Sequence, residues 1–185
     1  QISKISKKLY YYNKKVEIMF IRFPFLLNKK LKSIKLVAMD FDGVLTDGGI
    51  YLGNENLSFR KFNTKDGMGI KILQSLSIEL AIISGSNSMI INRRADNLGI
   101  KIIEKAVKNK AEALENIQNK YSITKEETLF LGDDVNDLSV IPKVKLFFTP
   151  LDGHISCKKK ANFIGNSKGG NGFLREVIDR ILIAN

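Results

Sequence analysis

The stretch that decides the fold is Leu36-Val37-Ala38-Met39-Asp40-Phe41-Asp42-Gly43-Val44-Leu45-Thr46. Four apolar residues lead directly into two aspartates at positions i and i+2. An unbroken apolar run is typical of a parallel strand covered on both faces, and ligands of open α/β sheets bind beyond the carboxyl ends of such strands. We therefore expect Asp40 and Asp42 at a functional site. The alternative is an ordinary Asp-rich turn after a strand.

Two later apolar runs also end in polar side chains. Residues 78–83 lead into Ser84, and residues 128–131 lead into an acidic cluster at Asp133, Asp134 and Asp137. The carboxyl ends of parallel strands meet at one edge of a sheet, so these side chains are expected to face the same point as Asp40. Close carboxylates repel one another unless a cation lies between them or one of them holds a proton. Oxygen ligands without Cys or His favour Mg²⁺, and the sequence predicts a magnesium site there.

The remaining elements alternate between strands and helices, which predicts an α/β fold with a doubly wound, mainly parallel sheet and right-handed crossovers. Residues 47–52 and 57–62 flank a Gly/Asn turn and predict a β-hairpin beside the site. Asp66 is expected to cap a helix that ends near Leu76. Further helices are predicted at 88–98, 109–121 and 173–184, a capping box at 124–127, and strands at 101–103 and 144–148.

The net charge of +11 is concentrated near the N-terminus. Residues 1–35 contain nine Lys and one Arg against a single Glu, and aromatic residues lie between them. We expect residues 1–33 to be a basic, aromatic N-terminal extension and residues 34–185 to be the core domain. Such an extension could bind nucleic acid or an anionic membrane surface. Its apolar part, residues 16–27, is too short and too interrupted to span a bilayer, so no stable membrane insertion is expected.

Cys157 and His154 are the only residues of their kinds. One cysteine cannot form a disulfide within the chain, and a Cys-based zinc site is excluded in practice. This fits a reducing compartment, and we expect a cytoplasmic protein. The simplest interpretation of His154 is a polar loop residue after Asp152-Gly153. The chain does not begin with Met, which would fit a piece of a longer protein.

The motifs over residues 36–185 resemble the haloacid dehalogenase superfamily of aspartate-nucleophile phosphatases. The resemblance implies that Asp40 attacks phosphorus and that Asp42 acts as general acid and then general base. It also implies that Ser84 donates a hydrogen bond to the phosphoryl group and that Lys110 neutralises charge. Asp133 would bind Mg²⁺ with Asp40 and the Asp42 main-chain carbonyl. In this scheme Asp137 orients Lys110 or a metal-bound water, and Asp134 could share either role.

The short connections between these motifs leave no room for a cap domain at either usual insertion place. Within the superfamily the chain resembles the 3-deoxy-D-manno-octulosonate 8-phosphate phosphatases, which are tetramers of lipopolysaccharide sugar synthesis. The shared segments are residues 40–48, 62–70, 83–85, 94–95, 98–100 and 169–176. The resemblance implies a homotetramer built through the hairpin and a sugar acid phosphate as substrate, with nucleic acid not expected as a partner.

The same resemblance implies substrate contacts from Asp42, Lys65, Ser84, Gly85 and Lys110, with the glycine-rich segment near residue 170 close to the sugar acid. This chain departs from the family at three positions: Ser86 and Lys65 stand where Arg is common, and Asn171 where a basic residue is common. A lost bidentate donor weakens recognition of an anionic group. Sugar acid phosphates of the sialic-acid type therefore remain an alternative substrate class.

Overall fold

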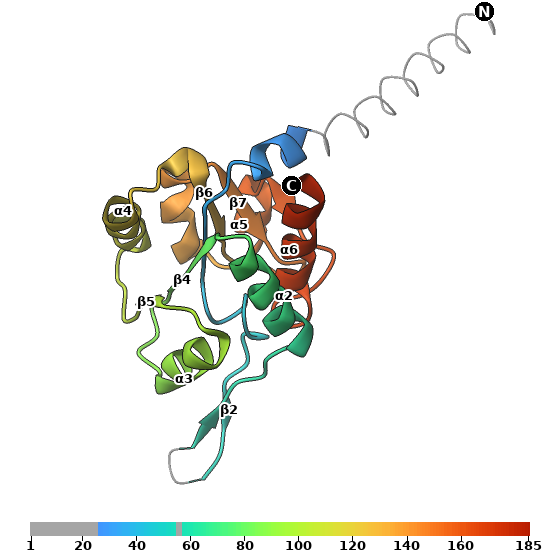
Figure 1. Ribbon diagram of the computed structural model, residues 1–185. Coiled ribbons are helices and arrows are strands. Elements are labelled where there is room, and N and C mark those ends of the chain that lie inside the picture. The colour runs from blue at the N-terminus through green and yellow to red at the C-terminus, as the bar shows by residue number, and fades with distance from the viewer. Residues whose placement is uncertain (1–25, 55–56) are drawn as a thin grey trace, which may run out of the picture.

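The computed structural model describes residues 26–54 and 57–185 (Figure 1). Its centre is a six-stranded sheet in the order β5-β4-β1-β6-β7-β8. The strands are β1 (Leu36–Met39), β4 (Glu79–Ile83), β5 (Ile102–Glu104), β6 (Thr128–Leu131), β7 (Leu146–Thr149) and β8 (Phe163–Ile164). Every pairing between neighbours in this sheet is parallel. The predicted parallel α/β sheet is confirmed.

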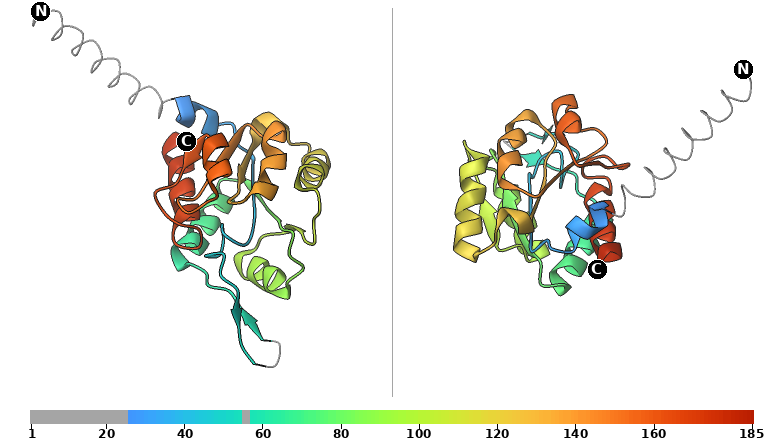
Figure 2. Two further views of the ribbon diagram at one scale, coloured as in Figure 1. Left: turned by 180° about the vertical axis from the view of Figure 1, so that it is seen from behind. Right: turned by 90° about the horizontal axis from the view of Figure 1, so that it is seen from above.

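Side chains that alternate along each strand build one hydrophobic cluster on each face of the sheet. Val37 and Met39 of β1 pack into a cluster with α2 (Thr64–Ser75), α3 (Met89–Leu98) and α6 (Phe173–Ala184). Leu36 and Ala38 face the opposite way, toward α4 (Lys110–Tyr121) and α5 (Ile155–Lys160). Because a strand has period 2, a continuous apolar run supplies both clusters. Helices therefore cover both faces, as the two views of Figure 2 show, and the doubly wound architecture is confirmed.

The strand order places a topological switch point beside β1. If the six strands are numbered along the chain, their order across the sheet is 3-2-1-4-5-6, so the chain winds in opposite directions from the boundary between β1 and β6. Ligands of such sheets bind outside the carboxyl ends of the strands at this boundary. Asp40 follows β1, and its N–H donates to the Leu131 carbonyl at the end of β6, at 2.9 Å. The aspartates of the two strands are thus neighbours because of the fold.

The ends of these helices agree with the predicted bounds. The hydroxyl of Ser88 accepts from the Ile90 N–H at the start of α3, and Gly99 ends that helix with φ of 70°. The side chain of Asn109 accepts from the Glu112 N–H at the start of α4. The predicted capping box of Thr124 and Glu127 is present, on the short 3₁₀ helix η1 (Lys125–Glu127). Each of these caps joins residues no more than four positions apart, so a short stretch of sequence contains the whole interaction.

The predicted role of Asp66 as the cap of its own helix is wrong. Asn63 is the N-cap of α2, and its side chain accepts from the Lys65 N–H at 2.8 Å. Asp66 instead accepts hydrogen bonds from the N–H groups of Gly172 and Arg175, in the first turn of α6, at 3.1 and 2.8 Å. Free N–H groups at a helix N-terminus attract a carboxylate, whichever segment supplies it. Asp66 therefore ties α2 to α6.

Within residues 34–185, three elements were not predicted: the 3₁₀ helix η2 (Val135–Lys143), α5 and β8. Pro142 lies inside η2, α5 has six residues, and β8 has two, so none of them carries a clear hydrophobic period. His154 is the N-cap of α5, where its Nδ1 accepts from the Ser156 N–H.

The predicted hairpin forms a flap, which we define as residues 47–54 and 57–62. Its strands β2 (Tyr51–Leu52) and β3 (Ser58–Phe59) are antiparallel. In Figure 1 the flap projects away from the sheet, at the end opposite the C-terminus. The flap and α2 are the only connection between β1 and β4, and α4 and η1 are the only connection between β5 and β6. In the described chain neither place holds a cap domain, as predicted.

Most of the expected N-terminal extension, and with it the predicted nucleic-acid or membrane-surface binding, lies outside the described residues. Residues 26–31 are helical, and the side chains of Leu27 and Leu31 are buried in the same cluster as α2 and α6. The core thus includes residues before position 34. Within the described part of the chain, no helix has both the length and the apolar character needed to cross a bilayer.

Candidate active site

The loop after β1 holds Asp40 in a defined position. The Asp40 side chain is 10% exposed, and its Oδ1 accepts from the Phe41 N–H at 2.6 Å. The loop turns at Gly43, whose φ is 81°. Gly170 supports the loop from the C-terminal segment, because its N–H donates to the Val44 carbonyl at 3.0 Å. A Cβ at Gly169 would collide with the backbone of Gly43, which explains why glycines occupy this segment.

Lys110 lies between two buried carboxylates. Its Nζ is 2.8 Å from Asp40 Oδ2 and 2.7 Å from Asp137 Oδ1. The Lys110 side chain is 2% exposed and that of Asp137 is fully buried. A buried charge is tolerated only when it is paired, so both carboxylates depend on Lys110 for compensation. The first residue of α4 is thereby brought to the carboxyl ends of β1 and β6.

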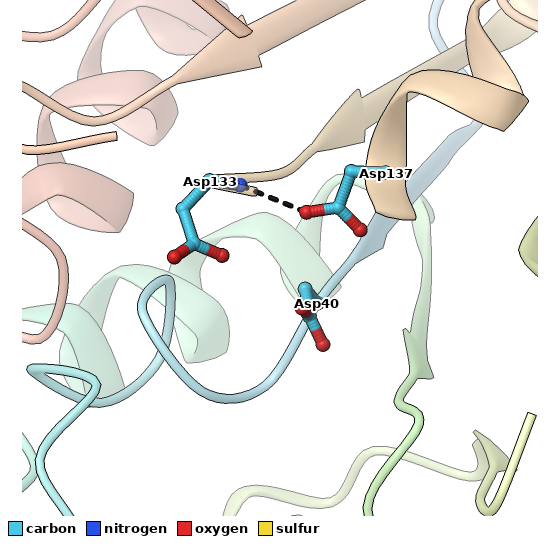
Figure 3. A group of neighbouring side chains, drawn as sticks. All are labelled: Asp40, Asp133 and Asp137. Atoms are coloured by element: carbon cyan, nitrogen blue, oxygen red, sulfur yellow. Dashed lines mark hydrogen bonds between the residues drawn. The ribbon is translucent and has the colours of Figure 1, made fainter. Parts of the chain in front are cut away.

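Asp133 completes the acidic cluster. Asp40, Asp133 and Asp137 each offer an oxygen within 4.8 Å of the others, and their carboxylates lie close together in Figure 3. Both oxygens of Asp137 already have partners, because Oδ2 accepts from the N–H groups of Asp133 and Asp134 at 2.9 and 3.2 Å. In contrast, Oδ1 of Asp133 is buried without a hydrogen-bond partner. A buried carboxylate oxygen without a donor, beside a second carboxylate, fits a hard divalent cation.

Gly43 leaves space for the Asp133 carboxylate. A Cβ at position 43 would collide with the side chain of Asp133. The glycine that follows Asp42 therefore permits both the positive φ of the loop and the approach of a carboxylate from β6. Asp134 points elsewhere: it is exposed, and its side chain accepts from the Val135 N–H at the start of η2.

The pKa values of Asp40 and Asp133 are raised. Burial raises the pKa of Asp40 to about 6, with a further contribution from Asp137, against the opposing effect of Lys110. Burial also raises the pKa of Asp133 to about 8, together with the charges of Asp40 and Asp137. For Lys110, burial lowers the pKa, but Asp40 and Asp137 outweigh it and the pKa is raised. One lysine is too little positive charge for three carboxylates.

Asp42 lies apart from this triad and pairs with the flap. Its Oδ1 is 2.8 Å from Nε of Arg60 and accepts a longer hydrogen bond, of 3.3 Å, from the Thr46 hydroxyl. Sequence reasoning missed Arg60. A signal was present in the predicted strand 57–62, where period 2 puts Arg60 on the same face as the apolar Phe62. In the structure the ring of Phe62 packs on Phe41, with centroids 5.8 Å apart.

The other predicted site residues lie around the triad or farther away. Ser84 is buried at the end of β4, the neighbour of β1, and its Oγ accepts from the Ser86 N–H. Gly85 follows it and is exposed. Lys65 lines a separate groove of about 650 Å³ with Asn171 and the first turn of α6. The structure therefore brings together Asp40, Lys110, Asp133 and Asp137, whereas Lys65 lies among a different set of residues.

Comparison with known proteins identifies the family. Residues 67–143 match the model of the haloacid dehalogenase-like hydrolases. The 3-deoxy-D-manno-octulosonate 8-phosphate phosphatase KdsC of Escherichia coli K12 is 36% identical over 155 residues, which are 84% of this chain and 82% of that protein. The chain belongs to this phosphatase family. It is a phosphoric monoester hydrolase of the haloacid dehalogenase type.

Solved structures of this phosphatase family agree in fold. The Moraxella catarrhalis enzyme, in complex with magnesium, phosphate and KDO, is 35% identical, with a TM-score of 0.83 over 85% of this chain and 91% of that chain. The cobalt-bound Haemophilus influenzae enzyme is 35% identical, with a TM-score of 0.80 over 84% of this chain and 91% of that chain. Both related structures contain a divalent metal ion.

We expect Mg²⁺ binding by this phosphatase to weaken as the pH falls. A carboxylate must lose its proton to bind a metal, and the pKa values of Asp133 and Asp40 are raised to about 8 and about 6. The apparent Kd for Mg²⁺ should rise by up to about tenfold for each pH unit below 8. Isothermal titration calorimetry between pH 6 and pH 8.5 measures this. A Kd that is constant over this range would contradict the prediction.

The raised pKa values of Asp40 and Asp133 also determine how the stability of the protein changes with pH. A carboxyl whose pKa is raised by folding stabilises the protein at low pH, and this stabilisation is lost as the pH rises through the folded-state pKa. The metal-free protein should therefore lose stability between about pH 4 and pH 8, and Mg²⁺ should raise the melting temperature more at pH 8 than at pH 6. The matched control is Asp133→Asn, in which the pH dependence caused by Asp133 should disappear and only that of Asp40, whose pKa is about 6, should remain.

Proposed function

We propose that this chain hydrolyses 3-deoxy-D-manno-octulosonate 8-phosphate through an aspartyl-phosphate on Asp40. The observation that carries the proposal is the contact of Asp40 Oδ2 with Lys110 at 2.8 Å, beside the partnerless Oδ1 of Asp133. A buried carboxylate with one cation and room for a second can approach a dianionic phosphate, which an isolated carboxylate would repel. The choice of substrate rests on the similarity to the 3-deoxy-D-manno-octulosonate 8-phosphate phosphatases.

In the first step, an oxygen of Asp40 forms a bond to phosphorus. The bond from phosphorus to the sugar oxygen breaks, and its electron pair stays on that oxygen, which takes a proton from the Asp42 carboxyl. In the second step, the Asp42 carboxylate accepts a proton from water as the water oxygen attacks phosphorus. The bond between Asp40 and phosphorus then breaks, which releases inorganic phosphate and restores both carboxyl groups.

The charge on the phosphoryl oxygens needs fixed positive partners. Lys110 is held by Asp137 and can neutralise both Asp40 and an incoming phosphate. Ser84 and the N–H of Gly85 are proposed to donate hydrogen bonds to the phosphoryl group from the end of β4. Asp137, through its two N–H contacts and its contact to Lys110, is proposed to position this part of the site, and Asp134 supports it by capping η2.

We propose Mg²⁺ as the cofactor, held by Asp40, Asp133 and the main-chain carbonyl of Asp42. When bound, the ion supplies Lewis-acid stabilisation of charge on the phosphoryl oxygens. The partnerless oxygen of Asp133 and the space that Gly43 leaves for its carboxylate support this assignment. We also propose that Lys65 contributes to recognition of the sugar acid.

A substrate panel with Mg²⁺ tests the proposed activity. The panel contains 3-deoxy-D-manno-octulosonate 8-phosphate, a nine-carbon sialic-acid-type 9-phosphate and a neutral hexose 6-phosphate, and released phosphate is measured. We expect the eight-carbon acid to have a kcat/KM at least about tenfold above the neutral sugar, which is 1.4 kcal/mol of differential binding. A preference for the nine-carbon acid would replace the proposed substrate. Equal rates on all three would contradict recognition of the acid.

We further propose that the flap builds a homotetramer. Ile50, Leu52 and Phe59 are 64%, 79% and 56% exposed, and so many exposed apolar side chains on one short hairpin are typical of a contact surface. Leu52→Glu should lower the oligomeric mass, measured by light scattering after size exclusion, because a charge would be buried in the contact. Ile183→Glu on α6, which is 77% exposed, is the control and should leave the mass unchanged. A monomeric wild-type protein would refute the assembly.

A further inference from the structure

We infer that Arg60 of the flap is a positioning residue for Asp42, an inference that rests on the proposed function. Nε of Arg60 is 2.8 Å from Asp42 Oδ1. The Arg60 side chain is only 7% exposed, whereas that of Asp42 is 31% exposed. The cation is thus the more buried member of the pair. Removing it would leave the Asp42 carboxyl without the partner that fixes its orientation toward the substrate.

The guanidinium is itself held in place. Nη1 of Arg60 donates to the carbonyl of Phe59 at 3.1 Å, so the flap backbone fixes the plane of the group. The base of the flap is attached to the catalytic loop through a β-bridge between Thr46 and Phe62 and through the contact of Phe62 with Phe41. Arg60 is therefore a rigid donor, and little conformational freedom is lost when it pairs with Asp42.

The two carboxylate oxygens of Asp42 differ in their hydrogen bonds. Oδ1 accepts from Arg60 and from Thr46, whose hydroxyl oxygen in turn accepts from the N–H groups of Gly43 and Gly48. Among the described residues, Oδ2 makes no such contact. Because Oδ1 is held by these hydrogen bonds, Oδ2 is the oxygen that can carry the proton and transfer it to the leaving oxygen of the substrate. Since transfer requires hydrogen-bond distance to that oxygen, the orientation that Arg60 imposes affects this step directly.

A pair of aryl phosphates of nearly equal size tests this role. Phenolate is a poor leaving group that needs the proton of Asp42 as the P–O bond breaks, whereas p-nitrophenolate leaves as a stable anion. For Arg60→Gln we expect kcat/KM to fall about 10- to 100-fold on phenyl phosphate and less than about threefold on p-nitrophenyl phosphate. The ratio kcat/KM is the proper readout because it reports only the steps up to the first P–O cleavage.

Two further variants separate positioning from charge and from folding. Arg93→Gln removes a guanidinium that lines the same small cavity as Arg60, about 260 Å³, from the exposed side of α3. It should change both substrates by less than about twofold, since Arg93 makes no contact with Asp42 among the described residues. Arg60→Lys keeps a charge without the planar fork and should recover part of the loss on phenyl phosphate.

The outcomes distinguish this inference from the proposed function. If the wild-type protein hydrolyses neither aryl phosphate nor the sugar acid phosphate, the proposed function fails. If the wild type is active but Arg60→Gln lowers kcat/KM equally on both aryl phosphates, Arg60 has a structural role only and the inference is overturned. An Arg60→Lys variant with full wild-type activity on phenyl phosphate would show that a charge alone is sufficient, and would likewise overturn the positioning role of the guanidinium.

Discussion

The Asp40→Asn variant is expected to fold and to lose at least about 10⁴-fold in kcat, because the amide cannot form the covalent bond to phosphorus. Its stability should be unchanged or higher at neutral pH. The carboxylate that it replaces is buried, with a pKa raised to about 6, so its ionised form is costly in the metal-free protein. Phosphate release measures the first effect, and thermal unfolding monitored by circular dichroism measures the second.

The control for this variant is Asp42→Asn. If Asp42 provides the proton and then activates water, its loss should slow both steps and leave the phosphoryl group on Asp40 for longer. Acid-quenched wild-type and Asp42→Asn proteins should carry a phosphoryl group on the peptide that contains Asp40, by mass spectrometry, and Asp40→Asn should not. Turnover by Asp40→Asn near the wild-type rate would end the assignment of the nucleophile.

Lys110→Met is expected to reduce both activity and stability. The substitution removes the cation between Asp40 and Asp137, and Asp137 is fully buried. Breaking a buried ion pair by removing one partner costs about 3–5 kcal/mol, because the remaining charge has no compensation. Loss of one fixed donor to the reacting group costs about 10²- to 10³-fold in kcat. Urea unfolding and steady-state kinetics with saturating Mg²⁺ measure the two effects.

Lys143→Met provides the matched control. Lys143 pairs with Glu115 at 2.9 Å, but both side chains are well exposed, at 39% and 49%. An exposed pair of this kind contributes about 0.5 kcal/mol or less. The two lysines differ mainly in burial, so a Lys110→Met variant as stable and active as Lys143→Met would refute the structural and catalytic importance of the triad.

Much of the fold and part of the site follow from local sequence. The run from Leu36 to Asp42 predicts a buried parallel strand that ends in carboxylates, and residues 128–133 repeat that pattern. The helices that begin at Ser88 and Asn109, and the end of the first one at Gly99, are predicted for the same reason, because their periodicity and end signals act within each helix. Periodicity and capping are interactions over a few residues, which a linear pattern contains in full.

Contacts between distant segments were harder to predict. Asp66 has the local pattern of a helix cap but binds the first turn of α6, more than a hundred residues away. Arg60 looked like an ordinary basic residue of a hairpin, yet it is the partner of Asp42. In both cases the side chain could pair with several groups. The tertiary packing determined which of these groups lies within reach.

The sequence by itself determined the parallel α/β class, the strand ends that carry the aspartates, and the family to which the chain belongs. Only the tertiary structure decided that Lys110 lies between Asp40 and Asp137, that Asp133 keeps a partnerless oxygen, and that the flap holds Asp42 through Arg60. The physical reason is that strand and helix preferences act within a few residues. Ion pairing and burial depend on distances between groups that only the packed sheet brings together.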